Sequence, residues 1–288
     1  MLRIAVPNKG VLSEPAAEML AESGYRMRRS TKDLVVYDPD NDTEFFYLRP
    51  RDIAVYVAAG TLDVGITGRD MLLETTPPEG GDAVAAEVMP LGFGRSSFRF
   101  ASPAESPVDE VAKLEGKRIA TAYPGLLQRF LDETGMKAAV VKLDGAVETA
   151  CRLGVADAVC DVVETGTTLR AAGLRIIGDP VLASEAVLVG RAGAAEVPAV
   201  AQLRRRLQGV LVARRYVMLD YDCPNELLAQ ATARTPGLEG PTVSPLQTPG
   251  WSAVRAMVRK EDTNRVMDEL WELGARAILV TSIAASRI

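Results

Sequence analysis

The sequence contains no histidine among its 288 residues. Without an imidazole, a single chain cannot hold a Ser/His/Asp triad, a histidine general base or a histidine-ligated zinc or iron. The mechanisms that remain use carboxylates, lysines, arginines, backbone dipoles and a hard, oxygen-ligated cation. This absence therefore excludes several classes of hydrolase and metalloenzyme.

Cysteine, long apolar runs and clustered basic charge are also scarce. Cys151, Cys160 and Cys223 show no metal-ligand spacing, and we expect them to be reduced and structural. No apolar run is long enough to span a membrane, and the chain reaches Pro7 and Lys9 before a signal peptide could form, so we expect a cytoplasmic protein without a membrane partner. The net charge is −5 and the basic residues are dispersed apart from Arg204–Arg206 on an expected helix, which disfavours a nucleic-acid partner.

The apolar pattern predicts an α/β fold with two lobes. Residues 1–92 alternate strand-like and helix-like segments, and a second such series begins near residue 97. The later run Ala186–Val189 could return the chain to the first lobe, which would leave a cleft between the lobes, a common place for a ligand. The predicted limits are 1–92 plus 182–210 for lobe I and 93–181 for lobe II.

A third part, residues 211–288, has a different pattern. Strand, helix, strand, strand, helix and strand follow one another, which is the βαββαβ order of a ferredoxin-like domain. Asp262 is expected to cap the last helix, and Gly274 to end it. The domain is poor in reactive side chains, so it suits a sensor or an oligomerisation module, and the two roles are compatible.

The most informative segment runs from Glu148 to Leu169. A helical pattern leads into the apolar run Val155–Val163, which is typical of a buried strand, and residues 164–168 then form a Gly/Thr turn before a helix. Free N–H groups at a helix start, together with threonine hydroxyls, bind phosphate. Asp161 and Glu164 would repel a bare phosphate, so we expect a ligand that also carries hydroxyl groups or Mg²⁺. An ordinary helix cap at a strand end is the alternative interpretation.

Three shorter segments also follow predicted strands. Lys9 lies where the carboxyl ends of parallel strands open onto ligand clefts and could contact a triphosphate, although a solvated lysine is the simpler interpretation. Segments 49–52 and 67–70 supply arginines, a glycine turn and a carboxylate, but their acidic residues could instead cap helices. Segment 92–99 could be a hinge that lines the cleft or a plain turn.

Together these motifs resemble the ATP phosphoribosyltransferase family, which catalyses the first step of histidine biosynthesis. The resemblance covers nearly the whole chain. Besides the segment 148–169, it rests on VPNKG (6–10), FFYLRPRDIAVYV (45–57), DVGITGRDML (63–72), RIATAYP (118–124), DGAVE (144–148) and LDYDCP (219–224). It implies the long, self-regulated form, with two periplasmic-binding-protein-like (type II) catalytic lobes and a C-terminal regulatory domain.

The resemblance also implies the reaction and its site. The 5-phosphoribosyl group passes from phosphoribosyl pyrophosphate to N1 of ATP, with Mg²⁺ held largely by substrate phosphates and with Glu148 or Asp161 as candidate protein ligands. Both carboxylates would face the sugar and act in catalysis. The residues implied to hold phosphoribosyl pyrophosphate are Asp161, Glu164, Thr165, Gly166, Thr167 and Thr168. Those implied to line the ATP side are Lys9, Arg49, Arg51, Asp70 and Tyr123.

For regulation, the resemblance implies feedback inhibition by L-histidine and a homo-oligomer, from dimer to hexamer. Asp222 would bind the inhibitor, with Leu238, Thr242 and Ala277 completing the pocket across an interface. The main alternative is a non-enzymatic two-lobed module that binds an anionic solute, although the start of the chain does not look like a signal peptide. A dehydrogenase with a regulatory tail is a second alternative, but the first strand is not followed by G-x-G-x-x-G.

Overall fold

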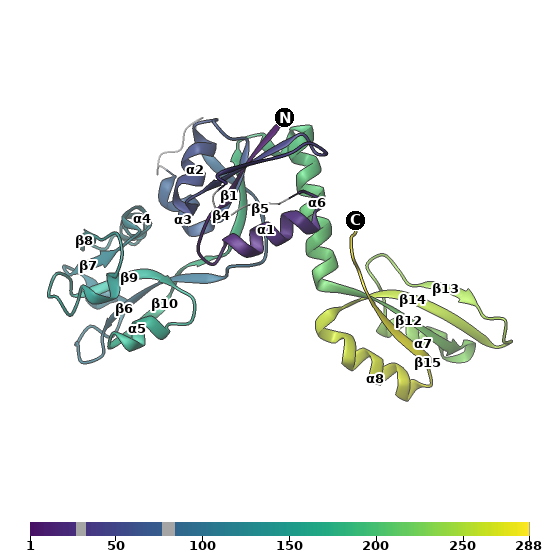
Figure 1. Cartoon of the computed structure of the whole chain (residues 1–288). Helices are drawn as coiled ribbons and strands as arrows, with labels where there is room; N and C mark the ends of the chain where they lie inside the picture. The colour runs from purple at the N-terminus through teal and green to yellow at the C-terminus, as the bar shows by residue number, and fades with distance from the viewer. Residues whose placement is uncertain (27–32, 77–83, 288) are drawn as a thin grey trace. The chain divides into compact units, whose positions relative to one another are not determined.

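The computed structural model describes residues 1–26, 33–76 and 84–287 (Figure 1). The chain divides into two compact units, Met1–Ala21 with Tyr25–Gln202, and Glu22–Gly24 with Leu203–Ile288. Within the described ranges, no helix combines the length and the apolarity needed to cross a bilayer. The limits predicted for the individual lobes stay predictions.

Lobe I of the first unit is built on a six-stranded sheet in the order β2-β3-β1-β4-β11-β5. Its strands are β1 (Leu2–Pro7), β2 (Val35–Asp38), β3 (Thr43–Leu48), β4 (Val64–Gly68), β5 (Ala85–Pro90) and β11 (Ala186–Arg191). Its helices are α1 (Ser13–Glu22), α2 (Pro50–Ala58) and α3 (Arg69–Thr75). β1 pairs in parallel with β3 and β4, whereas β11 is antiparallel to β4 and β5. The sequence pattern does not predict β5, because Ala85 is its one fully buried residue.

Lobe II is also built on a mixed sheet, with five strands in the order β10-β6-β9-β7-β8. Its strands are β6 (Ser96–Pro103), β7 (Arg118–Thr121), β8 (Ala139–Lys142), β9 (Ala158–Val163) and β10 (Leu174–Ser184), and its helices are α4 (Pro124–Thr134) and α5 (Thr167–Ala171). β7 pairs in parallel with β8 and β9, and β6 is antiparallel to β9 and β10. β11 in lobe I and β6 in lobe II each follow a segment that crosses between the lobes, and each joins its sheet as an antiparallel strand. This arrangement confirms the predicted two-lobed fold.

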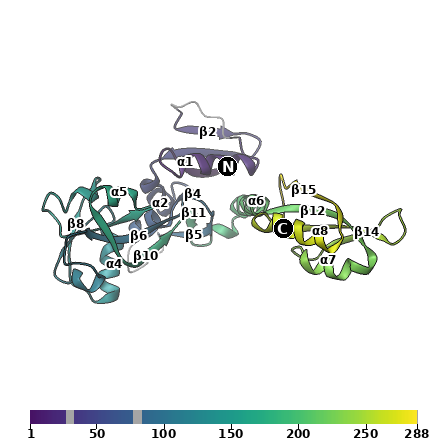
Figure 2. The same ribbon diagram turned by 90° about the horizontal axis from the view of Figure 1, so that it is seen from below.

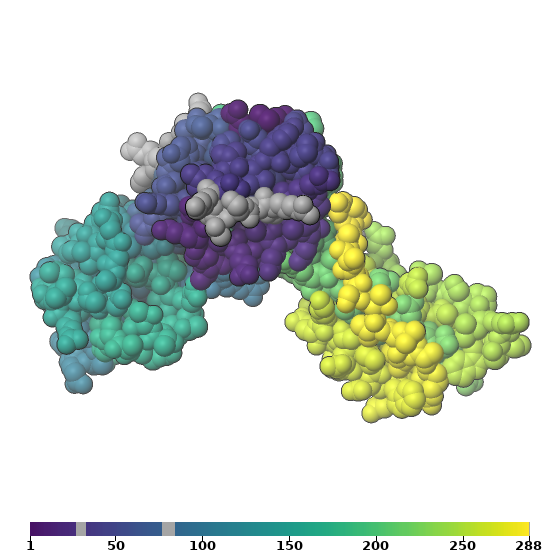
Figure 3. Space-filling model, viewed as in Figure 1, coloured from purple at the N-terminus to yellow at the C-terminus, as the bar shows by residue number. Residues whose placement is uncertain are grey.

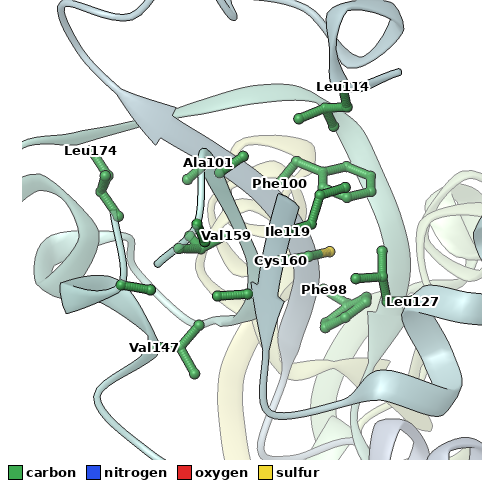
Figure 4. Packing of buried hydrophobic residues seen from close by; sticks show 14 of the residues in the cluster. Phe98, Phe100, Ala101, Leu114, Ile119, Leu127, Val147, Val159, Cys160 and Leu174 are labelled. Atoms are coloured by element: carbon green, nitrogen blue, oxygen red, sulfur yellow. The ribbon is translucent and has the colours of Figure 1, made fainter. Parts of the chain in front are cut away.

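The core of lobe II explains how its sheet is held in place. Phe98 and Phe100 of β6 are fully buried against Ile119 of β7 and Leu127 of α4 (Figure 4). Cys160 lies in the same cluster, and burial raises the pKa of its thiol well above the ordinary value. All three cysteines are free, as their spacing predicted.

Two crossing segments that lie side by side join the lobes. The N–H of Leu91 donates to the carbonyl of Ala186 at 2.9 Å, and the N–H of Ala186 donates to the carbonyl of Phe93 at 2.8 Å. The carboxylate of Glu185 accepts a hydrogen bond from the N–H of Gly92 at 2.9 Å. Only residues 91–95 connect the strands here, since the rest of the predicted hinge segment belongs to β6.

The second unit contains a four-stranded antiparallel sheet in the order β13-β14-β12-β15. Helix α6 (Pro198–Arg215) leads to β12 (Tyr216–Pro224), α7 (Leu228–Arg234), β13 (Thr242–Pro245), β14 (Trp251–Arg259), α8 (Thr263–Leu273) and β15 (Arg276–Ser282). Residues of α7 and α8 pack on the buried face of β12 (Figure 2). β15 lies largely at the surface, in yellow in Figure 3. The predicted βαββαβ domain is confirmed.

Three local predictions can be compared with the structure. The prediction of a helix before residue 155 is wrong, because a 3₁₀ turn at Val147–Thr149 and further turns occupy this stretch. Asp262 does not cap α8 with its side chain; its carboxylate instead accepts a hydrogen bond from Arg265 at 2.7 Å. Gly274 does end α8, with a φ of 113° that favours glycine.

Candidate active site

A cavity of about 370 Å³ lies beside the C-terminal end of β9. It is lined by Glu148 and by the continuous segment Asp161–Leu169. The structure therefore brings together every residue that the sequence predicted for phosphoribosyl pyrophosphate. The left-handed conformation of Gly166, with a φ of 72°, turns the chain from the buried strand into α5.

Asp161 is a partly buried acid in this cavity. Burial raises the pKa of its carboxyl group, while a 2.8 Å hydrogen bond from the N–H of Val162 and the charge of Arg51 oppose the increase. The charges of Glu148 and Asp70 raise the pKa further. Because Arg51 and Asp70 belong to lobe I, the electrostatic environment of this lobe II carboxylate is formed by both lobes.

The Gly/Thr turn carries a cation that the sequence analysis did not single out. The guanidinium of Arg170 donates to the carbonyl of Thr165 at 3.2 Å and lies 3.4 Å from the hydroxyl of Thr167. The hydroxyls of Thr165 and Thr167 are themselves 3.0 Å apart. The spacing could have identified Arg170, because it lies one helical turn beyond Gly166, where a side chain can fold back toward the Gly/Thr turn.

On the side predicted for ATP, residues from both lobes meet. The Arg51 guanidinium lies 4.8 Å from the centroid of the Tyr123 ring. Tyr123 is buried, and its hydroxyl lies near the charge of Asp70. Burial, followed by the charge of Asp70, holds the pKa of Tyr123 well above its ordinary value, and Arg51 opposes the shift. Tyr123 is therefore a protonated hydrogen-bond donor at neutral pH.

The other two residues predicted for the ATP side are Lys9 and Arg49. Lys9 and Arg49 are exposed at the C-terminal ends of β1 and β3, and among the described residues no hydrogen bond or ion pair joins either of them to Arg51, Asp70 or Tyr123. Beside Lys9, the side-chain oxygen of Asn8 is buried without a hydrogen-bond partner. A buried acceptor of this kind needs a partner, and a bound ligand could supply one.

Helices α3 and α4 connect the lobes next to this group. The carboxylate of Glu74 accepts hydrogen bonds from the N–H groups of Gly125 and Leu126, at 3.1 and 2.8 Å. In return, the Arg129 guanidinium donates to the carbonyls of Leu73 and Thr76, at 3.0 and 2.8 Å. Each helix thus supplies the side chain that satisfies free backbone groups at an end of the other.

The C-terminal unit has a separate cavity of about 310 Å³. Its lining residues are Met218, Leu238, Glu239, Gly240, Thr242, Arg255, Ala256, Met257 and Arg287. Leu238 and Thr242, predicted for inhibitor binding, are among them. Asp222 and Ala277 are not, because they lie near the irregular pairing of β12 with β15, where Ala277 has a left-handed φ of 50°. In one chain the four residues are thus split between two places.

The fold and the cavity beside β9 define the class of protein. It is a two-lobed α/β protein of the periplasmic-binding-protein-like type with a ferredoxin-like C-terminal domain. Residues 49–209 match the family model described as ATP phosphoribosyltransferase, and residues 213–285 match the model of its C-terminal domain. The chain belongs to the ATP phosphoribosyltransferase family, as the motifs indicated.

Individual relatives agree with this assignment. Proteins named ATP phosphoribosyltransferase from Arthrobacter sp. (strain FB24) and Salinispora tropica are 62% and 59% identical to this chain, each over the full length of both proteins. A solved structure titled as the ATP phosphoribosyl transferase (HisG:HisZ) complex from Thermotoga maritima is 28% identical, with a TM-score of 0.60. The match covers 72% of this chain and 97% of that chain.

Proposed function

We propose that this chain transfers the 5-phosphoribosyl group of phosphoribosyl pyrophosphate to N1 of ATP, releasing pyrophosphate, as the first step of histidine biosynthesis. The observation that carries the proposal is the cavity lined by Glu148 and Asp161–Leu169, in a chain that is 62% identical along its whole length to an ATP phosphoribosyltransferase. Membership of this family favours an enzyme over a non-enzymatic solute-binding module.

The Gly/Thr turn is proposed to hold the 5-phosphate of the sugar. Backbone N–H groups around Gly166 and the hydroxyls of Thr165, Thr167 and Thr168 line the cavity as donors, and Arg170 adds a positive charge beneath them. Asp161 and Glu148 would accept hydrogen bonds from the ribose hydroxyls. As pyrophosphate leaves, positive charge develops on the sugar, and two carboxylates beside it stabilise that charge.

The donor set fits Mg²⁺ that is bound mainly through the substrate. Glu148 and Asp161 line the same cavity and offer the hard oxygen ligands that Mg²⁺ prefers. In the part of the chain that the structure describes, no cluster of three or more acidic, cysteine or histidine side chains could hold a metal alone. Phosphate oxygens would complete the coordination, and the ion would neutralise charge on the leaving pyrophosphate.

Arg51, Asp70 and Tyr123 are proposed to form the wall against which ATP binds, with Lys9 and Arg49 free to reach its triphosphate. Adenine N1 attacks C1 of the ribose through a lone pair as the bond from C1 to pyrophosphate breaks, so no proton has to leave adenine before the attack, and the histidine base that this chain lacks is not required for that step. The main tasks of the protein are to position two polyanions and to offset their repulsion. ATP and phosphoribosyl pyrophosphate are cytoplasmic metabolites, so we propose that the enzyme acts in the cytoplasm.

The C-terminal domain is proposed to bind L-histidine and to inhibit the enzyme through a change in a homo-oligomer of two to six chains. The separation of Asp222 and Ala277 from the cavity that holds Leu238 and Thr242 suits a pocket completed by a second subunit. Linkage requires that substrates weaken histidine binding if histidine weakens theirs.

An ultraviolet assay for N1-substituted adenine tests the proposal. The purified protein is mixed with ATP, phosphoribosyl pyrophosphate and Mg²⁺, with and without L-histidine. Product that histidine suppresses is expected. Product that is insensitive to histidine would keep the enzyme and reject the sensor, whereas a folded protein that binds a substrate but forms no product would favour the solute-binding module.

A further inference from the structure

Ser184, at the end of β10, makes two hydrogen bonds to Asp70, at the start of α3. Its hydroxyl donates to Oδ1 of Asp70 at 2.6 Å and accepts from the backbone N–H of Asp70 at 3.1 Å. Both residues are 4% exposed, so water does not compete for these bonds. Ser184 thereby joins the main chain and the carboxylate of Asp70 into one closed ring.

The surrounding residues restrict Asp70 further. The neighbouring N–H of Arg69 donates to the carbonyl of Glu185 at 3.0 Å, so the crossing segment satisfies the first two N–H groups of α3. Gly68 precedes them, and a Cβ at that position would overlap the Asp70 carboxylate. The carboxylate therefore lies folded back over the helix start, in a position that only glycine at residue 68 leaves open.

This buried carboxylate faces the group predicted for ATP. Its charge acts on the Tyr123 hydroxyl of lobe II and on Asp161 in the cavity beside β9. Tyr123 in turn lies under the Arg51 guanidinium. A shift of the Asp70 side chain would therefore disturb the contact between the two lobes at the ATP wall.

We propose that Ser184 is a positioning residue for ATP, acting through Asp70. The inference rests on the proposed function and adds to it a residue that contacts no substrate itself. Ser184 holds the Asp70 carboxylate in one orientation, in which its charge acts on the Tyr123 hydroxyl beside the Arg51 guanidinium. Because Ser184 lies on a segment that crosses between the lobes, the ATP wall is assembled where the lobes are joined.

A simpler role for Ser184 would be to cap α3 and nothing more. Capping predicts a loss of stability alone, whereas positioning predicts a selective loss of ATP affinity. Ser102 provides a matched control, because its hydroxyl is also buried and donates a hydrogen bond, to the carbonyl of Val108, but it lies in lobe II away from both substrates' predicted contacts.

The experiment measures steady-state kinetics and ATP binding by calorimetry for Ser184→Ala, Ser184→Thr, Ser102→Ala and the wild-type chain. Ser184→Ala is expected to raise KM and Kd for ATP about tenfold, the size of effect typical for loss of a hydrogen bond to a charged group. KM for phosphoribosyl pyrophosphate should stay within about twofold, and Ser184→Thr should recover ATP affinity because it keeps the hydroxyl. Ser102→Ala should lower the melting temperature without changing either KM.

A double-mutant cycle with Asp70→Ala tests the route. If Ser184 acts through Asp70, Ser184→Ala should have no further effect on ATP affinity once Asp70 is removed. Additive effects, or unchanged ATP affinity in a folded Ser184→Ala protein, would overturn the proposal while leaving the enzyme assignment intact. A wild-type chain without transferase activity would instead overturn the proposed function. If Asp70→Ala does not fold, failure of Ser184→Thr to recover ATP binding is the outcome that contradicts the inference.

Discussion

Arg51 stacks on Tyr123, with the guanidinium 4.8 Å from the centre of the ring. Arg51 belongs to α2 of lobe I, and Tyr123 immediately precedes α4 of lobe II. The contact therefore joins the lobes at the proposed ATP wall through the ring of Tyr123, while the Tyr123 hydroxyl lies near the charge of Asp70.

Replacing Tyr123 should separate the two contributions. Tyr123→Phe keeps the ring on which Arg51 stacks but removes the hydroxyl near Asp70, whereas Tyr123→Leu removes both. We expect KM for ATP to rise severalfold in the first and about tenfold or more in the second, since a cation–π contact contributes about 0.5–2 kcal/mol. Initial rates at varied ATP test this. Tyr56→Leu, at an exposed tyrosine of α2, is the control; equal KM values in all three variants would contradict the prediction.

The acid limb of the pH profile should report Asp161. Burial raises its pKa, so activity that needs the ionised carboxylate is lost on acidification at a higher pH than for an ordinary aspartate. Arg51 lowers this pKa and Glu148 raises it. In plots of kcat/KM for phosphoribosyl pyrophosphate, Arg51→Met should move the acid limb to higher pH, and Glu148→Gln should move it to lower pH. A limb that stays in place in both variants would show that another group titrates.

Asp161 at the end of β9 and the Gly/Thr turn that follows it should be indispensable for turnover and dispensable for folding. Asp161→Asn and Thr168→Ala are expected to lower kcat/KM by about two orders of magnitude or more, because donors and charge at a transition state commonly contribute that much. Circular dichroism should remain like that of the wild type, since both side chains line a cavity. Thr134→Ala, on exposed α4 surface, is a threonine control. Wild-type turnover in the first two variants would remove the turn from the site.

The reciprocal capping of α3 and α4 should stabilise the two-lobed unit. Glu74→Ala removes the acceptor of two N–H groups, and we expect a loss of about 1–2 kcal/mol in the free energy of unfolding. Glu74→Gln should cost less, because its amide oxygen still accepts. Urea unfolding measures the difference, and Glu133→Ala, an exposed acid on α4, should stay within about 0.5 kcal/mol of wild type. A Glu74→Ala protein as stable as Glu133→Ala would refute this role.

Gly209 should be needed for the C-terminal residues to pack on α6. A Cβ there would collide with the backbone oxygen of Ser286, whose hydroxyl donates to the carbonyl of Gly209 at 2.9 Å. In an open helix, Gly→Ala stabilises by about 1 kcal/mol. We expect Gly209→Ala to destabilise instead and to make the C-terminus faster to digest with carboxypeptidase. Gln208→Ala, at the exposed neighbouring position, is the control; a gain of stability in Gly209→Ala would show that the contact is dispensable.

The proposed phosphoribosyl pyrophosphate site could be located from the sequence because most of it is local. Asp161–Leu169 is one continuous segment, and a buried strand followed by a Gly/Thr turn has a recognisable composition. Even here the stretch before residue 155 was misassigned as helix, since short apolar runs do not distinguish helix from turns. Arg170 was overlooked because its backward bond to Thr165 depends on the side-chain conformation.

By itself, the sequence determined the fold class, the position of most strands along the chain, the absence of histidine chemistry and the composition of the Gly/Thr turn, since all of these follow from residues close together in the chain. The tertiary structure decided which strand ends meet. Ser184 and Asp70 are 114 residues apart, and Arg51 reaches a tyrosine of the other lobe. Contacts at such separations depend on how two sheets and their crossing segments pack, and local composition carries no record of that packing.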